Sequence, residues 1–424
     1  MTHTLIDLGE VPAVLEVRRR PPPYRAVLGV LSAVLLLAAG GAAYQRPPAG
    51  PTVIPARLGD TFTIDGNRLY LVGAGGVDSF GSVRDRAITS YELPSMREVS
   101  RTTVGVSGTV VSVQQAGDTV VVGYQLDASG DQVTVAYPAG GGPMLWHRPD
   151  RLVSVSSADG IVLLSADGGD VAIDLATGAE RWRVSRPANG VLAETVAGTG
   201  YPQWLISLSG QGRLLAYDAH TGRRIGATTV PTGNRPIAGL IWPVGSYLLV
   251  GVGGRYDGYR VPGLERLWQT PADLSQSWMQ DDCGTVICTF RQQRGMTVLD
   301  PADGQVLWSS DRWTSAGALG PHLMATGGSD EGGGARLSVL DPRTGRELGN
   351  FGDWQGLGLA PGGLIYGMIQ APGHYRLVYG LLDPADRSIE VLGSADRVSG
   401  GCETGGGVLA CRLVDASVAV WRLG

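Results

Sequence analysis

From about Thr52 onward, the chain consists of short apolar runs separated by glycine-containing turns. Valine, leucine, isoleucine and tyrosine dominate these runs, and no stretch shows the 3.6-residue period of an amphipathic helix. Runs of this kind, bounded by turn residues, are typical of β-strands. The predicted strands cover Arg68–Gly73, Thr119–Tyr124, Gly160–Ser165, Trp204–Ser209, Tyr247–Gly251, Thr285–Phe290, His322–Gly327, Leu364–Met368 and Gly407–Leu413. Second strands follow at Asp170–Asp174, Arg213–Asp218, Gly295–Asp300, Arg336–Asp341 and Arg376–Asp383. The pattern predicts an all-β domain.

One uncharged apolar run, Ala26 to Tyr44, is much longer than the others. As a helix it would span roughly 28 Å, close to the hydrocarbon thickness of a bilayer. Four arginines precede it, which places the N-terminus in the cytoplasm. We therefore expect a cytoplasmic tail (1–25), a single transmembrane helix in the plasma membrane (26–44), a Pro-rich linker (45–51) and an extracytoplasmic domain (52–424). The alternative is a cleaved signal peptide, although its N-terminal region would be unusually long.

A nine-residue segment, Asp174 to Trp182, recurs at Asp300 to Trp308. In both copies a glycine (Gly178, Gly304) lies four residues after the aspartate, and the tryptophan lies four residues after the glycine. Degraded copies carry Asp218 with Gly222, Asp341 with Gly345, and Asp383. The five aspartates are separated by 44, 82, 41 and 42 residues. A period of about 41 residues, with four strands per repeat, is typical of a β-propeller blade.

Each residue type in the repeat has a predicted structural role. The aspartate carboxylate can accept hydrogen bonds from the turn amides, and the glycine can supply a positive φ. The tryptophan can fill the space between adjacent blades. Segments ending at Trp146 and Trp268, together with the turn at Leu93–Arg97, extend the series where the full motif is missing.

The turns predict an eight-bladed propeller, with seven or nine blades as alternatives. Counted literally, the repeats give nine sheets, but one irregular early segment is interpreted as less than a full blade. Ring closure is expected between an N-terminal strand, Thr52–Leu58, and the last blade, Val398–Gly424.

The repeat resembles the tryptophan-docking repeat of the pyrroloquinoline-quinone-type (PQQ-type) propellers, over roughly residues 52–424. This family includes quinoprotein dehydrogenases and cofactor-free relatives similar to the lipoprotein scaffold of outer-membrane barrel assembly. The resemblance to the dehydrogenases implies a quinone and a calcium ion in the central channel, often beside a disulfide between adjacent cysteines. This chain has no adjacent cysteines and no C-x-x-C-H haem motif. We therefore expect neither PQQ nor calcium.

All four cysteines lie in the distal half of the chain and allow three connectivities. The close pairs are favoured, because each brackets a predicted strand–turn–strand and facing strands bring Cβ atoms within bridging distance. Zinc is the alternative, but neither spacing is C-x-x-C and no histidine is near. The predicted disulfides join Cys283 to Cys288 and Cys402 to Cys411.

Composition narrows the functional classes. The formal net charge of −5 shows no basic excess, so we expect no nucleic-acid partner. All 34 cationic side chains are arginine, which indicates a bacterial source of high GC content. Histidines are scattered, and His220 is interpreted as a solvated turn residue. The glycine runs 73–76 and 251–254 precede strands, not helices, and are interpreted as turns.

Two features leave other binding modes open. Acidic doublets at Asp281-Asp282 and Asp330-Glu331 are candidates for calcium, but two carboxylates are too few without further oxygen ligands. The tryptophans outside the repeat motif could line a glycan or peptide groove, but we expect them to pack within or between blades. They are Trp204, Trp242, Trp278, Trp313, Trp354 and Trp421.

The sequence thus favours a non-enzymatic, monomeric, membrane-anchored propeller that binds another protein of the bacterial envelope. The alternative is a small-ligand-binding protein, or a quinone- and calcium-dependent oxidoreductase, that uses the central channel.

Overall fold

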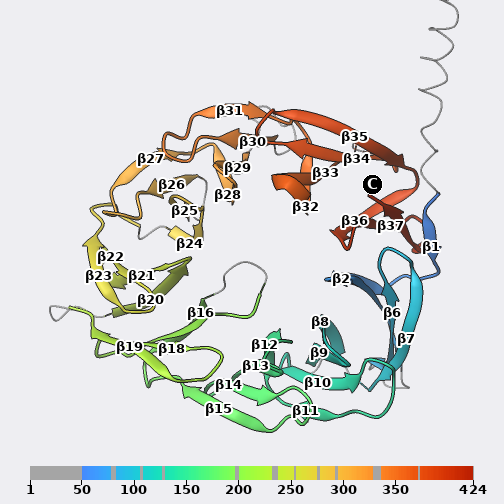
Figure 1. Ribbon diagram of the computed structural model, residues 1–424, viewed down its shortest axis with the longest axis horizontal. Coiled ribbons are helices and arrows are strands. Elements are labelled where there is room, and N and C mark those ends of the chain that lie inside the picture. The colour runs from blue at the N-terminus through green and yellow to red at the C-terminus, as the bar shows by residue number, and fades with distance from the viewer. Residues whose placement is uncertain are drawn as a thin grey trace, which may run out of the picture. The chain divides into compact units, whose positions relative to one another are not determined.

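The computed structural model describes residues 50–77, 83–105, 108–126, 129–195, 200–231, 237–252, 255–274, 277–291, 295–327, 336–370 and 373–423. They belong to one compact unit, Gly50–Gly424. Within these ranges the chain forms nine four-stranded antiparallel sheets arranged as a ring (Figure 1). The all-β propeller prediction is confirmed.

Each sheet is one blade, numbered here in chain order. Blade 1 contains β2 (Thr61–Asp65), β3 (Arg68–Val72), β6 (Arg86–Glu92) and β7 (Arg97–Val104), and blade 2 contains β8 (Gly108–Ala116), β9 (Thr119–Leu126), β10 (Gln132–Pro138) and β11 (Trp146–Arg148). Blade 3 contains β12 (Arg151–Ser156), β13 (Ile161–Ala166), β14 (Gly169–Asp174) and β15 (Glu180–Ser185), and blade 4 contains β16 (Val191–Thr195), β17 (Trp204–Leu208), β18 (Arg213–Asp218) and β19 (Arg224–Thr229). Blade 5 contains β20 (Ile237–Val244), β21 (Tyr247–Val252), β22 (Arg255–Arg260) and β23 (Glu265–Gln269).

The remaining blades follow the same order. Blade 6 contains β24 (Ser277–Asp282), β25 (Ile287–Arg291), β26 (Met296–Leu299) and β27 (Val306–Ser310), and blade 7 contains β28 (Trp313–Leu319), β29 (His322–Gly327), β30 (Arg336–Leu340) and β31 (Glu347–Asn350). Blade 8 contains β32 (Gln355–Ala360), β33 (Leu364–Gln370), β34 (Leu377–Asp383) and β35 (Ser388–Ala395), with a 3₁₀ turn at Pro361–Gly363. Blade 9 contains β36 (Val398–Gly405), β37 (Val408–Leu413), β38 (Val418–Arg422) and β1 (Thr52–Ile54). A two-stranded hairpin, β4 (Gly76–Val77) and β5 (Val83–Arg84), extends from blade 1.

The prediction of eight blades is wrong, because the described residues form nine sheets. The early segment interpreted as less than a full blade belongs to a complete one, and the turns of blades 1 and 5 use residues other than glycine. In blade 1 the turn position equivalent to Gly178 is Met96, with φ 60°, and in blade 5 it is Leu264, with φ 59°. The N–H groups of Met96 and Leu264 donate to the carbonyls four residues earlier, as does that of Gly178. The backbone hydrogen bond and the positive φ are therefore retained where the glycine is lost.

Ring closure occurs in the predicted place but over a shorter strand. Thr52, Val53 and Ile54 pair with Val420, Ala419 and Val418 of β38. The strand ends at Ile54, since Pro55 has no N–H to donate to the ladder.

Each blade is buried on both faces, which explains the continuous apolar runs in the sequence. In β13, Val162 and Leu164 pack toward blade 2 in a cluster with Val121, whereas Leu163 packs toward blade 4 with Leu205. Successive strand residues point to opposite faces, so both must be apolar. The ring is held by these interblade layers, and the first strand of each blade lies nearest its centre (Figure 1).

In the part of the chain described above, no helix is long and apolar enough to cross a membrane. The predicted transmembrane segment, residues 26–44, the tail 1–25 and the linker residues 45–49 lie outside the described residues.

Candidate functional site

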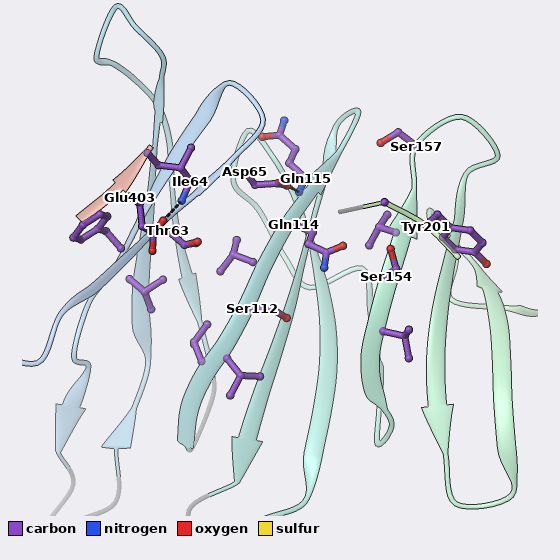
Figure 2. A pocket seen from close by; sticks show the side chains of 18 of the residues that line it. Thr63, Ile64, Asp65, Ser112, Gln114, Gln115, Ser154, Ser157, Tyr201 and Glu403 are labelled. Atoms are coloured by element: carbon purple, nitrogen blue, oxygen red, sulfur yellow. Dashed lines mark hydrogen bonds between the residues drawn. The ribbon is translucent and has the colours of Figure 1, made fainter. Parts of the chain in front are cut away.

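A pocket of about 720 Å³ lies against the inner strands of blades 9, 1, 2 and 3 (Figure 2). We call it the channel pocket. Its wall comes from β2, β8, β12, Glu403 on β36, and the segment Gly200–Pro202 that precedes β17. Asp65, Gln115 and Ser157 lie at the turn end of these strands (Figure 2). Segments far apart in the sequence therefore share one concave surface.

Two carboxylates join neighbouring blades along this wall. Glu403 Oε2 accepts a hydrogen bond from the backbone N–H of Ile64 at 2.8 Å, which links blade 9 to blade 1. Asp65 Oδ2 accepts one from the N–H of Gln115 at 3.2 Å, which links blade 1 to blade 2. The Tyr70 hydroxyl donates to Gln115 Oε1 at 2.6 Å. These contacts fix the spacing of three inner strands.

The environment of Glu403 disfavours its charged form. Burial raises the pKa of its carboxyl above the ordinary value, while the hydrogen bonds from Ile64 and Thr63 partly oppose the increase. Burial likewise raises the pKa of Tyr201, whose hydroxyl donates to the carbonyl of Ala219 at 3.0 Å.

The described residues that line the pocket include no arginine, lysine or histidine, and Asp65 and Glu403 are the charged groups among them. The other polar side chains are neutral. Within the described residues, five of these have no protein hydrogen-bond partner: Thr61, Ser112, Gln114, Ser154 and Ser157. The wall therefore offers neutral donors and acceptors to whatever occupies the pocket.

The candidate calcium positions are the acidic doublets at Asp281-Asp282 and Asp330-Glu331. Across the described ranges, no group of three or more His, Cys, Asp or Glu residues is placed to hold a metal ion. Asp282 is the last residue of β24, and its Oδ1 accepts the N–H of Gly284 in the following turn at 2.8 Å. Asp330 and Glu331 lie outside the described residues.

The repeat aspartates organise the turns between the third and fourth strands. Asp174 Oδ1 accepts from the N–H groups of Ala176 and Thr177 at 3.0 and 2.9 Å, and from the Thr177 hydroxyl at 3.0 Å. Hydrogen bonds from Arg181 and then Thr177 lower the pKa of Asp174 to about 2. Turn amides also donate to the carboxylates of Asp218, Asp300, Asp341 and Asp383.

The repeat tryptophans contact the turn of the following blade. Trp308 Nε1 donates to the carbonyl of Pro342 at 2.9 Å, and its ring covers Gly345, where an added Cβ would lie 2.6 Å from Cδ2. The same arrangement pairs Trp146 with Gly178, Trp182 with Gly222 and Trp268 with Gly304. The glycine is thus required both by its positive φ and by the neighbouring blade, a role that the sequence pattern alone did not show.

His220 is in the predicted turn, but it also contacts the neighbouring blade. Its Nδ1 lies 2.7 Å from Asp159 Oδ2 in blade 3, and its ring centroid is 5.0 Å from that of Tyr201. Outside the repeat motif, Trp313, Trp354 and Trp421 are buried, as predicted for packing residues, while Trp204 and Trp242 are half-buried. The side chain of Trp278 lies outside the described part of the structure.

The structure contains the two predicted disulfides. Cys283 is bonded to Cys288 at the β24–β25 hairpin, and Cys402 is bonded to Cys411 across β36 and β37. Both pairs are close in sequence and neither lies in the channel pocket.

A second surface lies at the opposite end of the ring from the aspartate turns. Its loops carry three exposed apolar side chains, Leu58 (90% exposed), Tyr375 (62%) and Val414 (43%), which we call the apolar patch. Backbone hydrogen bonds place two of these loops together, because Val398 N–H donates to the carbonyl of Tyr375 at 2.8 Å and Val414 N–H donates to that of Arg397 at 2.8 Å.

The third loop is attached to the same blade. Arg412 of β37 donates both to the carbonyl of Ala416, in the turn with Val414, and to the carbonyl of Asp60, in the Pro55–Asp60 segment with Leu58. A groove of about 660 Å³, the seam groove, runs between this segment and blade 1, where Arg101 contributes to its wall. The patch therefore borders a concavity where the ring closes.

These features define a β-propeller whose blades are joined by tryptophan docking. Residues 84–239 match the family PQQ_2, described as outer membrane protein assembly factor BamB. The resemblance to PQQ-type propellers is confirmed over this segment, which runs from β5 into β20. No curated protein sequence matches the chain.

Among solved structures, the crystal structure of BamB from Moraxella catarrhalis aligns with 13% identity and a TM-score of 0.42, covering 89% of this chain and 98% of that one. The computationally designed Ika8 protein aligns with 16% identity and a TM-score of 0.44, covering 75% and 97%. The C-terminal WD40 domain of Sif2 aligns with 7% identity and a TM-score of 0.44, covering 89% and 98%. At these TM-scores the three matches carry no argument about function.

Proposed function

We propose that this protein is a non-enzymatic interaction scaffold of the bacterial cell envelope, monomeric and anchored in the plasma membrane by residues 26–44, with its propeller outside the cytoplasm. The apolar patch is the observation that carries the proposal. Exposed apolar side chains on neighbouring loops of one surface are typical of protein-interaction sites. Loops of a stiff scaffold are where binding residues commonly lie.

The chemistry of the patch specifies the kind of partner. Tyr375 provides a large amphipathic side chain, a residue type enriched in interface hot spots. Charged pairs border it: Arg397 with Asp415 at 2.9 Å, and Arg376 with Asp396 at 3.6 Å. An apolar centre with a polar rim fits a protein loop that inserts an apolar side chain into the seam groove and contacts charges of both signs around it.

The channel pocket supports a scaffold over an oxidoreductase. Its two carboxylates are hydrogen-bonded to backbone amides of neighbouring blades, so they stabilise the ring. Among the described residues of its wall, no arginine is present to orient an anionic cofactor. We therefore propose that the protein functions without PQQ or calcium.

The cellular location rests on the N-terminal sequence and the family match. The apolar run 26–44 follows an arginine-rich segment, which supports a cytoplasmic N-terminus. The family matched by residues 84–239 is described by an outer-membrane assembly role, which supports an envelope location for the partner.

In-cell cross-linking of the full-length tagged protein, followed by capture from solubilised membranes and mass spectrometry, tests this function. The double variant Leu58→Asp/Tyr375→Ala should lose at least about 90% of the cross-linked partner, as expected when an apolar centre and a hot spot are removed together. Met144→Asp is the matched control: Met144 is 49% exposed and lies at the other end of the ring.

Equal capture by the double variant and the wild type would show that the partner does not use the patch. Absence of any partner for wild-type protein that is folded and present in membranes would contradict the scaffold function itself.

A further inference from the structure

The channel pocket contains polar groups that the fold does not use. Ser112, Gln114 and Ser154 extend from the inner strands β8 and β12 toward the pocket (Figure 2). Together with Thr61 and Ser157, they make no hydrogen bond to another described residue. We propose that this pocket binds a neutral carbohydrate, independently of the protein partner that docks on the apolar patch.

The size of the pocket suits such a ligand. Small-molecule pockets typically have volumes of about 300–1,000 Å³. The channel pocket, at about 720 Å³, falls within this range and is large enough for a short oligosaccharide.

The hydrogen-bonding character of the wall matches sugar hydroxyls. Serine and threonine hydroxyls and the glutamine amide each both donate and accept, and so do the hydroxyls of a sugar. Asp65 adds an ionised acceptor: its Oδ2 takes the N–H of Gln115, and no described residue donates to its second oxygen. A hydroxyl that donates to this oxygen would form a charge-assisted hydrogen bond.

Electrostatics argue against charged ligands. An anion would face Asp65 and Glu403, with no cationic side chain among the described wall residues to compensate. A cationic ligand would use the two carboxylates but leave the five neutral polar groups without a role. Glu403 is also partly committed, since it already accepts the N–H of Ile64.

Tyr201 provides an aromatic ring at one side of the pocket (Figure 2). Its hydroxyl is occupied by the carbonyl of Ala219, so the ring is the part available to a ligand. Aromatic rings offer an apolar surface on which the C–H faces of a sugar can pack.

Saturation-transfer NMR and calorimetry on the full-length protein in detergent can test the proposal with chitotetraose, maltotetraose and xylotetraose as probes. At least one should bind, and Gln114→Leu and Asp65→Asn should each weaken its binding by about tenfold, the effect of losing one good hydrogen bond. Gln355→Leu is the control, because Gln355 is an exposed glutamine on the inner strand β32 of blade 8, outside the pocket.

Three results would overturn the proposal. The first is that none of the three oligosaccharides binds to folded protein. The second is that binding is unchanged in both pocket variants. The third is that spermidine binds and loses affinity in Asp65→Asn while the sugars do not bind, which would identify a site for cations. None of these outcomes depends on the apolar patch, because the two surfaces share no residue.

Discussion

The carboxylate of Glu403 accepts the backbone N–H of Ile64 across a separation of 339 residues, at a distance of 2.8 Å. This contact joins the inner strands of blades 9 and 1, while the pairing of Thr52–Ile54 with β38 completes blade 9 at its outer edge. The ring therefore closes at two places, one on the channel wall and one on the rim. Loss of the inner contact should loosen the seam without removing a strand.

Glu403 provides a pH-dependent test of this closure. Because burial raises its pKa above 4.5, the folded state favours the protonated form. The contribution of Glu403 to the free energy of unfolding is therefore complete below pH 4.5 and is lost as the pH rises through the raised pKa. Glu403→Gln keeps an acceptor for Ile64 but cannot ionise, so the variant should lose this part of the pH dependence. Urea unfolding followed by tryptophan fluorescence between pH 4 and 8 measures it.

Glu403→Leu separates the hydrogen bond from the charge. It leaves the Ile64 N–H without its acceptor, at an expected cost of about 1–3 kcal/mol in the free energy of unfolding. A Gln variant with the same pH slope as the wild type, or a Leu variant as stable as the Gln variant, would contradict the role assigned to this contact.

Asp170 provides a second titrating group, at the interface of blades 3 and 4. The residue is 2% exposed, and within the described part of the chain its Oδ2 has no hydrogen-bond partner. Burial, followed by the charge of Glu194, raises the pKa of Asp170 from 3.8 to about 6. The hydrogen bond from Ser165 and the charges of Arg186 and Arg151 oppose this increase without cancelling it.

A pKa raised by burial predicts the direction of the mutational effect. The contribution of Asp170 to stability is complete below pH 3.8 and declines as the pH rises through about 6. Asp170→Asn should therefore be more stable than the wild type at pH 7.5, by about 3 kcal/mol, and indistinguishable from it near pH 4. Asp167→Asn, in the exposed turn before β14, is the control and should change neither value. A destabilised Asp170→Asn at pH 7.5 would show that the charged form is favoured in the fold.

The repeat motif predicted the architecture but not the number of blades or the pocket. The spacing of the aspartates reveals one four-stranded unit, because the motif fixes the turn between the third and fourth strands. Blades 1 and 5 have Met96 and Leu264 at positive φ in place of the glycine, so the sequence shows their repeats only in degraded form. The pocket residues form no motif at all. Glu403 and Gln114 come together only through ring closure, and position on the first strand of a blade is the only sequence signal that they share.

Substitution of Gly345, in blade 7, tests the docking of Trp308 from blade 6. It has φ +68°, and an added Cβ would meet the ring of Trp308 at 2.6 Å. Gly352 has a similar φ, +63°, with nothing within 4 Å of the added Cβ. Gly352→Ala should cost about 1 kcal/mol for the left-handed backbone alone. Gly345→Ala should cost about 2–4 kcal/mol, since displacing the Trp308 ring adds to that strain.

A double-mutant cycle with Trp308→Ala isolates the contact. Without the indole, Gly345→Ala should cost only about as much as Gly352→Ala, so the two effects should be non-additive by about 1–3 kcal/mol. Chemical unfolding of the four proteins gives the coupling energy. Additive effects would mean that Trp308 does not restrict the turn.

The disulfide between Cys402 and Cys411 should stabilise the last blade more than the one between Cys283 and Cys288 stabilises blade 6. The two bonds enclose sequence separations of 9 and 5 residues, and a longer loop loses more conformational freedom when it is closed. Cys411 and Cys288 are both fully buried, so the length of the enclosed loop is the difference on which the comparison rests. Replacing both cysteines of this pair by alanine should lower the free energy of unfolding by about 2–4 kcal/mol.

Thermal unfolding with and without a phosphine reductant tests this directly: the wild type should lose stability on reduction, and the Cys402→Ala/Cys411→Ala variant should lose much less. If instead the Cys283→Ala/Cys288→Ala variant becomes the one insensitive to the reductant, the hairpin of blade 6, and not the blade that closes the ring, carries the stabilising bond.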